Sequence, residues 1–493
     1  GRRIRHFYDN ARRRIRTRLP SRLSYLMEYD HWDRQTSLDA ADGTKVSSEW
    51  SGGALLSSSA GGLTRGYDAL GRLVKESTSS GTVVRTLDPC GRVASVRTSS
   101  GAEFRYQYDV AGRLRTCTTS RGEIELRHDR RGHPVQHRIG SVVVDSVFDQ
   151  VDRLVATTAT LSGGRQPILG AVFAYDGFDN VARLDDVLWG TSRQEYDAAW
   201  QLVHAADQDR SGRVVREQRF ERTDLGSPVA IASSGVALHQ YDAGGRVRSA
   251  DGTRYAYDPD GRVVAIELPD GKKFSLAWNA LGQLAAVTAG EMTVRYEYDL
   301  LWRRIRKRVQ GKGGALVEEV RFLWLDDAMI EEISSLHGSR VHIPDPDTGH
   351  PLAMVDERGL VPCVTAHNGL VRELVTRDGS IAWAGRFGPH GTLEDQRGSG
   401  QPLRYLGQYY DDETGLHYNR SRYYDPRSGS YLRADPIGLA GGLNPYLYSA
   451  NPANEVDPLG LAPGRSRSPQ GPNETDGEFA SRIGPHEAPS GYV

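Results

Sequence analysis

The chain has 493 residues, and 62 lysines and arginines against 63 aspartates and glutamates give a formal net charge of −1. No global positive field therefore attracts nucleic acid or an anionic membrane. Three widely spaced cysteines exclude a disulfide framework and a Cys-rich zinc site, and no run reaches the roughly 18 apolar residues of a membrane span. Phosphate loops, dinucleotide fingerprints and zinc motifs are missing from the sequence, so we expect no cofactor.

A short pattern recurs along most of the chain. It consists of an aromatic residue, Asp, two variable residues, Gly, Arg and then Leu or Val, and its cleanest copies begin at Tyr67, Tyr108, Tyr241 and Tyr257. When degenerate copies are included, the first position falls at residues 67, 87, 108, 128 and 148, at intervals of 20 or 21 residues. A fixed period of this length indicates a repeat architecture.

Each copy of the pattern predicts the corner of a β-hairpin. The Asp opens a type I turn, and the Gly three residues later adopts a left-handed conformation that closes the hairpin through a bulge. Between corners, Phe104, Tyr106 and Tyr108 alternate with Arg105 and Gln107, as in a half-buried strand. A second turn lies midway in each unit, so one period contains two strands and two turns.

The repeats therefore predict an all-β chain, with an antiparallel strip of hairpins over about residues 8–310. One two-stranded unit cannot bury its apolar face alone, so neighbouring units must stack, and a long strip exposes its edges unless it coils on itself. A set of separate β-sandwiches is the alternative. Their strand spacing would vary more, and their connections would not reuse one turn formula.

Two basic segments have two interpretations. Residues 2–22 contain nine arginines, and residues 303–308 contain five lysines or arginines. Such segments can form a local patch for nucleic acid or a membrane surface. Both lie in register with the repeat, so we expect their side chains to line one face of strands, and we expect no nucleic-acid partner. The repeated tyrosines are interpreted as packing residues, with sugar binding as the alternative.

The repeat resembles the YD repeats of Rhs proteins, which also occur in Tc toxin C components, wall-associated proteins and teneurins. The segment from Ala366 to Gly391 resembles the stretch before the Rhs core, and Arg404–Asp411, Glu413–Arg420 and Arg422–Pro426 resemble the Rhs-associated core itself. The resemblance implies that the strip spirals into a hollow, cocoon-like shell that the core domain closes. It divides the chain into a YD-repeat shell (1–310), continuing shell and pre-core segment (311–400), core with autoproteolytic motifs (401–461) and a remnant or truncated toxin region (462–493).

The core segment contains the same pentapeptide pattern twice. Asp435-Pro436-Ile437-Gly438-Leu439 is followed 22 residues later by Asp457-Pro458-Leu459-Gly460-Leu461. Asp, Pro and Gly at these positions fit a type I turn, which would point each carboxylate out from a rigid corner. Alternatively, two carboxylates brought together would share a proton and act as an aspartic-protease dyad. The spacing alone permits both interpretations.

The Rhs resemblance favours the dyad, because paired aspartates in these motifs carry out autoproteolysis after the Leu of the second motif. It implies that Asp435 and Asp457 are the catalytic pair and that the Leu461–Ala462 bond is cut. Arg433, two residues before the first Asp, is a candidate for orienting a carboxylate. An exposed arginine without such a role is the alternative.

The resemblance implies a secreted or translocated bacterial effector shell that cleaves itself and no other substrate. The implied partners are its own C-terminal toxin segment inside the shell, a spike or adaptor of a type VI or related secretion system, and a cognate immunity protein. After Leu461 only 32 residues remain, rich in Pro, Gly and Ser, and we expect them to be disordered. An uncleaved surface scaffold for adhesion or carbohydrate binding, and a degenerate shell that has lost its toxin, are the alternatives.

Overall fold

The computed structural model describes residues 3–164, 166–232, 235, 237–461 and 463–465. Over these residues the regular structure is β-strand with three short 3₁₀ helices, so the all-β prediction is confirmed. Consecutive strands pair antiparallel, in one sheet of 22 strands, one of 16 and two small sheets. In the part of the chain that the structure describes, no helix has the length and apolar character needed to cross a membrane.

We call the 22-stranded sheet the first coil. Its strands are β1 (Arg5–Tyr8), β2 (Arg14–Arg18), β3 (Ser24–Tyr29), β4 (Gln35–Ala40), β5 (Lys45–Ser51), β6 (Ala54–Ser58), β7 (Leu63–Tyr67), β8 (Leu73–Thr78), β9 (Gly81–Leu87), β10 (Val93–Thr98), β11 (Glu103–Tyr108), β12 (Leu114–Thr119), β13 (Gly122–His128), β14 (Pro134–Ile139), β15 (Val142–Phe148), β16 (Leu154–Leu161), β17 (Leu169–Tyr175), β18 (Val181–Asp186), β19 (Gly190–Tyr196), β20 (Leu202–Gln208), β21 (Val214–Arg222) and β22 (Pro228–Ile231).

We call the 16-stranded sheet the second coil. Its strands are β23 (His239–Tyr241), β24 (Val247–Ala250), β25 (Thr253–Tyr257), β26 (Val263–Glu267), β27 (Lys273–Trp278), β28 (Leu284–Ala289), β29 (Met292–Tyr298), β30 (Arg304–Gln310), β31 (Leu316–Leu325), β32 (Ala328–Ser334), β33 (Gly338–Pro344), β34 (Pro351–Asp356), β35 (Gly359–Thr365), β36 (Val371–Val375), β37 (Ile381–Phe387) and β38 (Leu393–Gly398).

The remaining elements are short. They are β39 (Tyr409–Asp411), β40 (Leu416–Asn419), β41 (Arg422–Asp425), β42 (Ser430–Tyr431), β43 (Glu455–Val456) and β44 (Gly464–Arg465), with the 3₁₀ helices η1 (Ala60–Gly62), η2 (Lys312–Gly314) and η3 (Gly438–Gly441).

The hairpin corners have the predicted chemistry. At the Tyr108 corner, the backbone N–H of Gly112 donates to the carbonyl of Asp109 (3.0 Å), and Gly112 has a φ of 86°. The Asp109 carboxylate accepts from the backbone N–H of Arg113 (3.0 Å) and pairs with its guanidinium (2.6 Å). A register shift at Tyr108 marks the bulge. The turn-and-bulge prediction is confirmed, because Asp and Gly supply the acceptor and the left-handed residue it requires.

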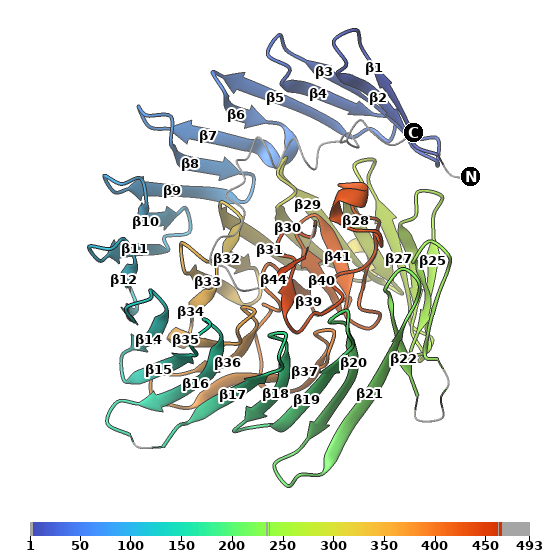
Figure 1. The fold of residues 1–493 in the computed structure, drawn as a ribbon. Helices are drawn as coiled ribbons and strands as arrows, with labels where there is room; N and C mark the ends of the chain where they lie inside the picture. The colour runs from blue at the N-terminus through green and yellow to red at the C-terminus, as the bar shows by residue number, and fades with distance from the viewer. Residues whose placement is uncertain (1–2, 165, 233–234, 236, 462, 466–493) are drawn as a thin grey trace.

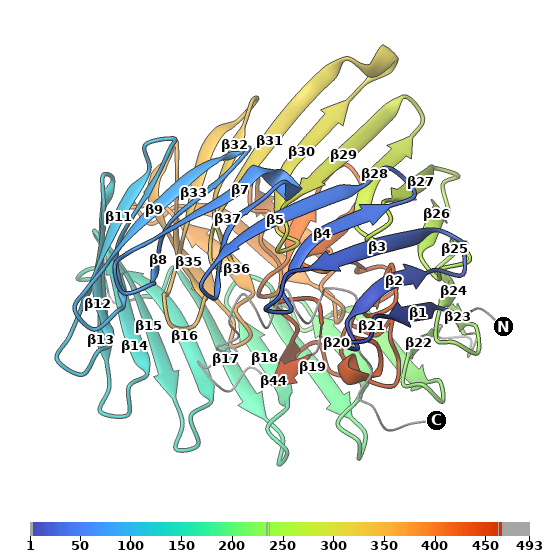
Figure 2. The same ribbon diagram turned by 90° about the horizontal axis from the view of Figure 1, so that it is seen from above.

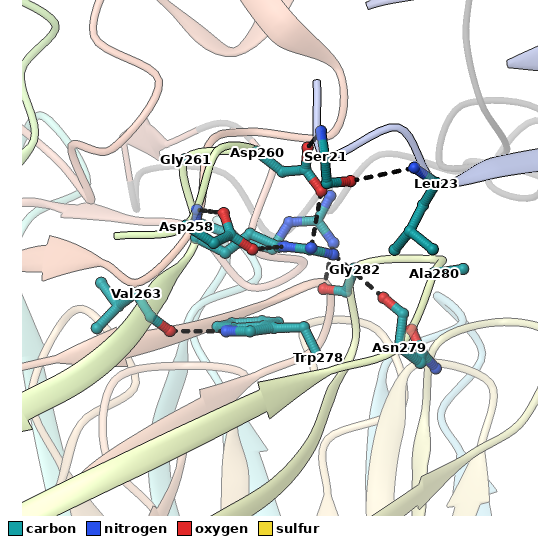
Figure 3. A network of polar contacts seen from close by, with 12 residues as sticks. Ser21, Leu23, Asp258, Asp260, Gly261, Val263, Trp278, Asn279, Ala280 and Gly282 are labelled. Atoms are coloured by element: carbon teal, nitrogen blue, oxygen red, sulfur yellow. Dashed lines mark hydrogen bonds and ion pairs between the residues drawn. The ribbon is translucent and has the colours of Figure 1, made fainter. Parts of the chain in front are cut away.

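The aromatic and arginine positions of the pattern connect one corner to the next. The Tyr108 hydroxyl donates to the carbonyl of Val93, one repeat earlier (2.8 Å), and the guanidinium of Arg92 lies 4.2 Å from the centre of the Tyr108 ring. A tryptophan serves equally well, since the indole N–H of Trp278 donates to the carbonyl of Val263 (2.7 Å; Figure 3). These links explain why the pattern recurs at a fixed period.

The strip winds through more than one circuit. In Figure 1 the first coil runs around the outside of the molecule and the second coil continues beside it, with the core segment 401–461 in the middle. Figure 2 shows the same coils from above. Several contacts between the coils join residues 236–241 positions apart: Ser21 with Asp260 (2.8 Å; Figure 3), Asp42 with Ala280 (2.5 Å), Arg85 with Asp326 (2.7 Å), Tyr106 with Pro344 (2.8 Å) and Ser141 with Arg377. We call the line of contacts between the two coils the seam.

The core segment packs against both coils. Tyr418 and Tyr423 belong to an apolar cluster with residues of the second coil, such as Val294. Tyr424 and Tyr448 belong to a cluster that includes Phe173, Leu154 and other residues of the first coil. The position of the core segment therefore depends on both coils.

In the second basic segment, residues 303–308, Arg304 is buried and does not lie on a solvated strand face. The Arg304 side chain is 1% exposed, pairs with Asp411 of the core segment (2.6 Å), and has its guanidinium 4.6 Å from the centre of the Tyr418 ring. A buried charge needs a partner of this quality to offset its lost hydration. Arg304 thus anchors the core segment to the second coil.

Candidate autoproteolytic site

Both pentapeptides form turns, as their residues predict. The N–H of Gly438 donates to the carbonyl of Asp435 (3.0 Å), and the N–H of Gly460 donates to the carbonyl of Asp457 (3.2 Å). The two carboxylates do not point into solvent, however, since each side chain is only 1% exposed. The turns aim both aspartates into the protein interior.

Arg422, on β41, brings the two carboxylates together. Its Nη2 lies 3.0 Å from Oδ2 of Asp435 and 3.0 Å from Oδ2 of Asp457. Its Nε donates to the carbonyl of Gly460 (2.6 Å), and its guanidinium lies 3.6 Å from the centre of the Tyr431 ring. One buried guanidinium therefore compensates both carboxylates and fixes the second turn.

Asp457 is surrounded by donors. Its Oδ2 accepts from the Tyr431 hydroxyl (2.8 Å), and its Oδ1 accepts from the backbone N–H of Leu461 (2.8 Å). The side-chain amide of Asn419 donates to its backbone carbonyl (2.9 Å). With Nη2 of Arg422 (3.0 Å from Oδ2), three donors thus bind this one carboxylate. Asp457 also binds the residue that precedes the bond predicted to be cut.

Asp435 is in a different electrostatic environment. Burial raises the pKa of Asp435 from its ordinary value of 3.8 to about 6, and the negative charge of Asp457 adds to the rise. Arg422 and the backbone N–H of Ile437, which donates to Oδ1 (2.9 Å), oppose it. A raised pKa on one of two neighbouring carboxyls suits that residue to act as the acid in an acid–base pair.

The Leu461 carbonyl lies beside the Asp435 carboxyl. The two groups converge on Gly441, at the end of η3, where a Cβ would be 2.6 Å from the Leu461 oxygen and 2.7 Å from Cγ of Asp435. Only a residue without a side chain leaves these groups undisturbed. The Asp435 carboxyl and the Leu461 carbonyl thus lie close to the same point, while Asp457 accepts the Leu461 N–H.

Both sides of the predicted cleavage point are attached to the core segment. The side chain of Leu461 is buried, and β44, three residues further on, pairs antiparallel with β43. Ala462, on the other side of the bond, lies outside the described residues. Residues 466–493, for which we predict disorder, also lie outside them. The chain is held on either side of Ala462.

Arg433 was predicted to orient a carboxylate, and its guanidinium binds outside the pair, whereas Arg422 contacts both aspartates. The Arg433 Nη1 donates to the carbonyl of Gly282 (2.6 Å), and its guanidinium lies 5.2 Å from the centre of the Trp302 ring. Arg433 therefore binds the core segment to the second coil. Burial, with Arg262 and Arg422 nearby, lowers the pKa of Arg433 to about 10.

Sequence reasoning gave no role in the site to Arg422, Tyr431 or Gly441. Arg422 lies in the segment that resembles the Rhs-associated core, and Gly441 follows the first pentapeptide closely, so their place in the chain was the available signal. Their contacts depend on how β41 and η3 fold over the turns.

Among the described residues, no group of three or more His, Cys, Asp or Glu side chains is arranged to hold a metal ion.

Comparison with known proteins identifies relatives of the chain. It is 28% identical over 436 residues to the double-stranded DNA deaminase toxin A of Burkholderia cenocepacia, and the match covers 72% of this chain and 30% of that protein. It is 29% identical over 388 residues to the toxin protein Tse5 of Pseudomonas aeruginosa, covering 64% and 29% respectively. The chain thus spans less than a third of the length of these relatives.

The fold and the sequence family agree. The crystal structure of TcdB2-TccC3-Cdc42 superposes with a TM-score of 0.77 at 17% identity, over 93% of this chain and 27% of that one, which supports the spiral-shell fold. Residues 67–103 match the RHS repeat, and residues 136–440 match the teneurin YD-shell. Because the second match extends over more than half of the sequence, the chain belongs to the teneurin YD-shell family and carries RHS repeats.

Proposed function

We propose that this chain is the shell of a secreted effector that cleaves itself after Leu461 and so releases its C-terminal toxin segment. The observation that carries the proposal is the placement of Leu461 between the two motif aspartates. Asp457 accepts its N–H at 2.8 Å, and its carbonyl converges with the Asp435 carboxyl on Gly441. In the uncleaved chain Leu461, the residue before the predicted cleavage point, thus lies at the candidate dyad.

The proposed reaction is a hydrolysis. In this scheme Asp435 is the acid, whose carboxyl polarises the Leu461 carbonyl, and Asp457 is the base, which accepts a proton from the attacking water. The water oxygen adds to the carbonyl carbon, and the bond to the nitrogen of residue 462 then breaks. Asp457 passes the proton that it took from the water to this nitrogen, which leaves as an amine, and Leu461 keeps the new carboxyl group. Arg422 and the Tyr431 hydroxyl hold Asp457 in place throughout.

The partners follow from the same proposal. Two relatives are named as toxins, which supports a toxin as the segment that the shell encloses. A cognate immunity protein would protect the producing cell, and a spike or adaptor of a type VI or related secretion system would carry the effector out. We expect no nucleic-acid partner for the shell itself, since the formal net charge of the chain is −1 and Arg303 and Arg304 are buried in ion pairs.

Intact mass of the purified full chain tests the proposal. We expect the parent to lose residues 462–493, and we expect Asp435→Asn and Asp457→Asn each to remain whole. Asp425→Asn is the matched control, because Asp425 is equally buried and pairs with Arg427 (2.7 Å) away from Leu461. It should still be cleaved. A parent that stays whole when folded would favour the uncleaved scaffold for adhesion or carbohydrate binding.

Cleavage should slow as the pH rises above about 6. The pKa of Asp435 is raised to about 6, so this carboxyl keeps its proton up to that pH and loses it above. If the protonated form is the active one, the rate falls about tenfold per pH unit between pH 7 and 8.5. The measurement is the appearance of the shortened chain after refolding from urea at each pH, with recovery of tryptophan fluorescence as the control for folding. A rate that increases over this range would assign the acid role elsewhere.

A further inference from the structure

The side chain of Leu461 lies in an apolar pocket. It is 2% exposed and belongs to a cluster with Leu55, Leu63, Leu301 and Trp302. Side chains from the two aspartate motifs, Ile437 and Leu459, pack against the same cluster. The residue before the proposed cleavage point is therefore bound by its side chain as well as by its N–H.

The walls of this pocket come from three parts of the chain. Leu55 and Leu63 lie on β6 and β7 of the first coil, whereas Leu301 and Trp302 form the corner between β29 and β30 of the second coil. Leu461 itself ends the core segment. The first and second coils meet here, so the pocket exists only where the seam is closed.

A buried ion network holds the seam beside the pocket. Glu76 of the first coil pairs with Arg65 (2.8 Å) and with Arg303 of the second coil (2.5 Å), and Arg303 also pairs with Asp299 (2.7 Å). All four side chains are at most 5% exposed. Burial of these charges is tolerated only while each keeps its partners, so the two coils separate at high cost.

The backbones of the first and second coils also approach closely beside this pocket. A Cβ on Gly61 of η1 would lie 2.9 Å from Cα of Asp299 and 2.8 Å from the Ile305 side chain. The chain between Leu55 and Leu63 is thus seated directly on the corner that carries Leu301 and Trp302. Nothing larger than glycine fits there without displacing the corner.

We infer that the first coil supplies half of a specificity subsite for the Leu461 side chain, and that self-cleavage therefore waits for the seam to close. The inference rests on the proposed function and adds its regulation. An apolar pocket of this make-up selects an aliphatic side chain of about the size of leucine, and it holds Leu461 close to Asp435. A chain whose first coil is not docked has intact motifs but half a subsite, so the toxin segment stays attached until the shell is assembled.

The test is the cleavage rate of the full chain after refolding, measured by intact mass. Leu63→Ala should slow cleavage by about tenfold or more, because small displacements of a reacting group cost large factors in rate. Leu202→Ala is the matched control, since Leu202 is equally buried in a separate cluster of the first coil. It should cleave at the parental rate.

Changes at position 461 separate recognition from folding. We expect Leu461→Met to be cleaved and Leu461→Ala to be cleaved slowly. Leu461→Phe should restore cleavage to Leu63→Ala, because the larger side chain fills the space left by the smaller one. A global loss of stability would not be reversed by that second change.

The outcomes are distinct. Cleavage of Leu63→Ala at the parental rate, or equal slowing by Leu202→Ala, would overturn the subsite while leaving the proposed function intact. Failure of the folded parent to cleave would overturn both. Slow cleavage of Leu63→Ala with recovery in the double variant would support the subsite.

Discussion

Replacing Gly441 with alanine should stop self-cleavage while leaving the shell folded. The new Cβ would lie 2.6 Å from the carbonyl oxygen of Leu461 and 2.7 Å from Cγ of Asp435, too close for either group to stay in place. Moving the acid away from the carbonyl by about 1 Å costs on the order of a hundredfold in rate. Intact mass after refolding is the measurement, and the shortened chain should be missing.

Gly53→Ala is the control for this change. Gly53 lies in an exposed hairpin turn of the first coil, and a Cβ there meets no atom within 4 Å. This variant should be cleaved as the parent is. Efficient cleavage of Gly441→Ala would mean that Asp435 does not act on the Leu461 carbonyl from its present position.

Replacing Arg422 with methionine should have the second large effect, on both cleavage and stability. Without its guanidinium, the carboxylates of Asp435 and Asp457 lose the group that binds both at 3.0 Å, and the carbonyl of Gly460 loses its donor. Removing one partner of a buried ion pair costs about 3–5 kcal/mol. We expect a lower urea midpoint and no shortened chain.

Two further variants sharpen that experiment. Arg254→Met is the control, because Arg254 is 71% exposed and an exposed ion pair such as the one it forms with Glu267 adds little to stability. Arg422→Lys should recover part of the stability and little of the cleavage, since one ammonium cannot reproduce the planar set of bonds to both aspartates and to Gly460. Cleavage of Arg422→Met at the parental rate would exclude Arg422 as a positioning residue.

The corners of the strip were predictable because their chemistry is local. Asp109 and Gly112 lie three residues apart, and the turn they form needs no distant partner. The two pentapeptide turns were predictable for the same reason. The direction of their carboxylates was not, because it depends on β41 lying across both turns and bringing Arg422 to them.

The contacts between the coils leave no trace in the sequence pattern. Glu76 and Arg303 belong to different circuits of the strip, and neither residue type nor spacing connects them. We predicted an orienting role for Arg433 because it lies two residues from Asp435, but its side chain donates to the carbonyl of Gly282 in the second coil. Proximity along the chain was a poor guide wherever the partner came from the neighbouring coil.

The seam also fixes how many repeats the shell contains. Solenoids that stack in a line can gain or lose a unit, because each unit contacts only its neighbours. Here Asp42 must meet Ala280 and Tyr106 must meet Pro344, both 238 residues further on. Deleting one repeat of 20 or 21 residues from the circuit would slide every later corner past its partner. The number of residues in one circuit is therefore fixed by these pairings, and such a shell can lengthen only at its ends.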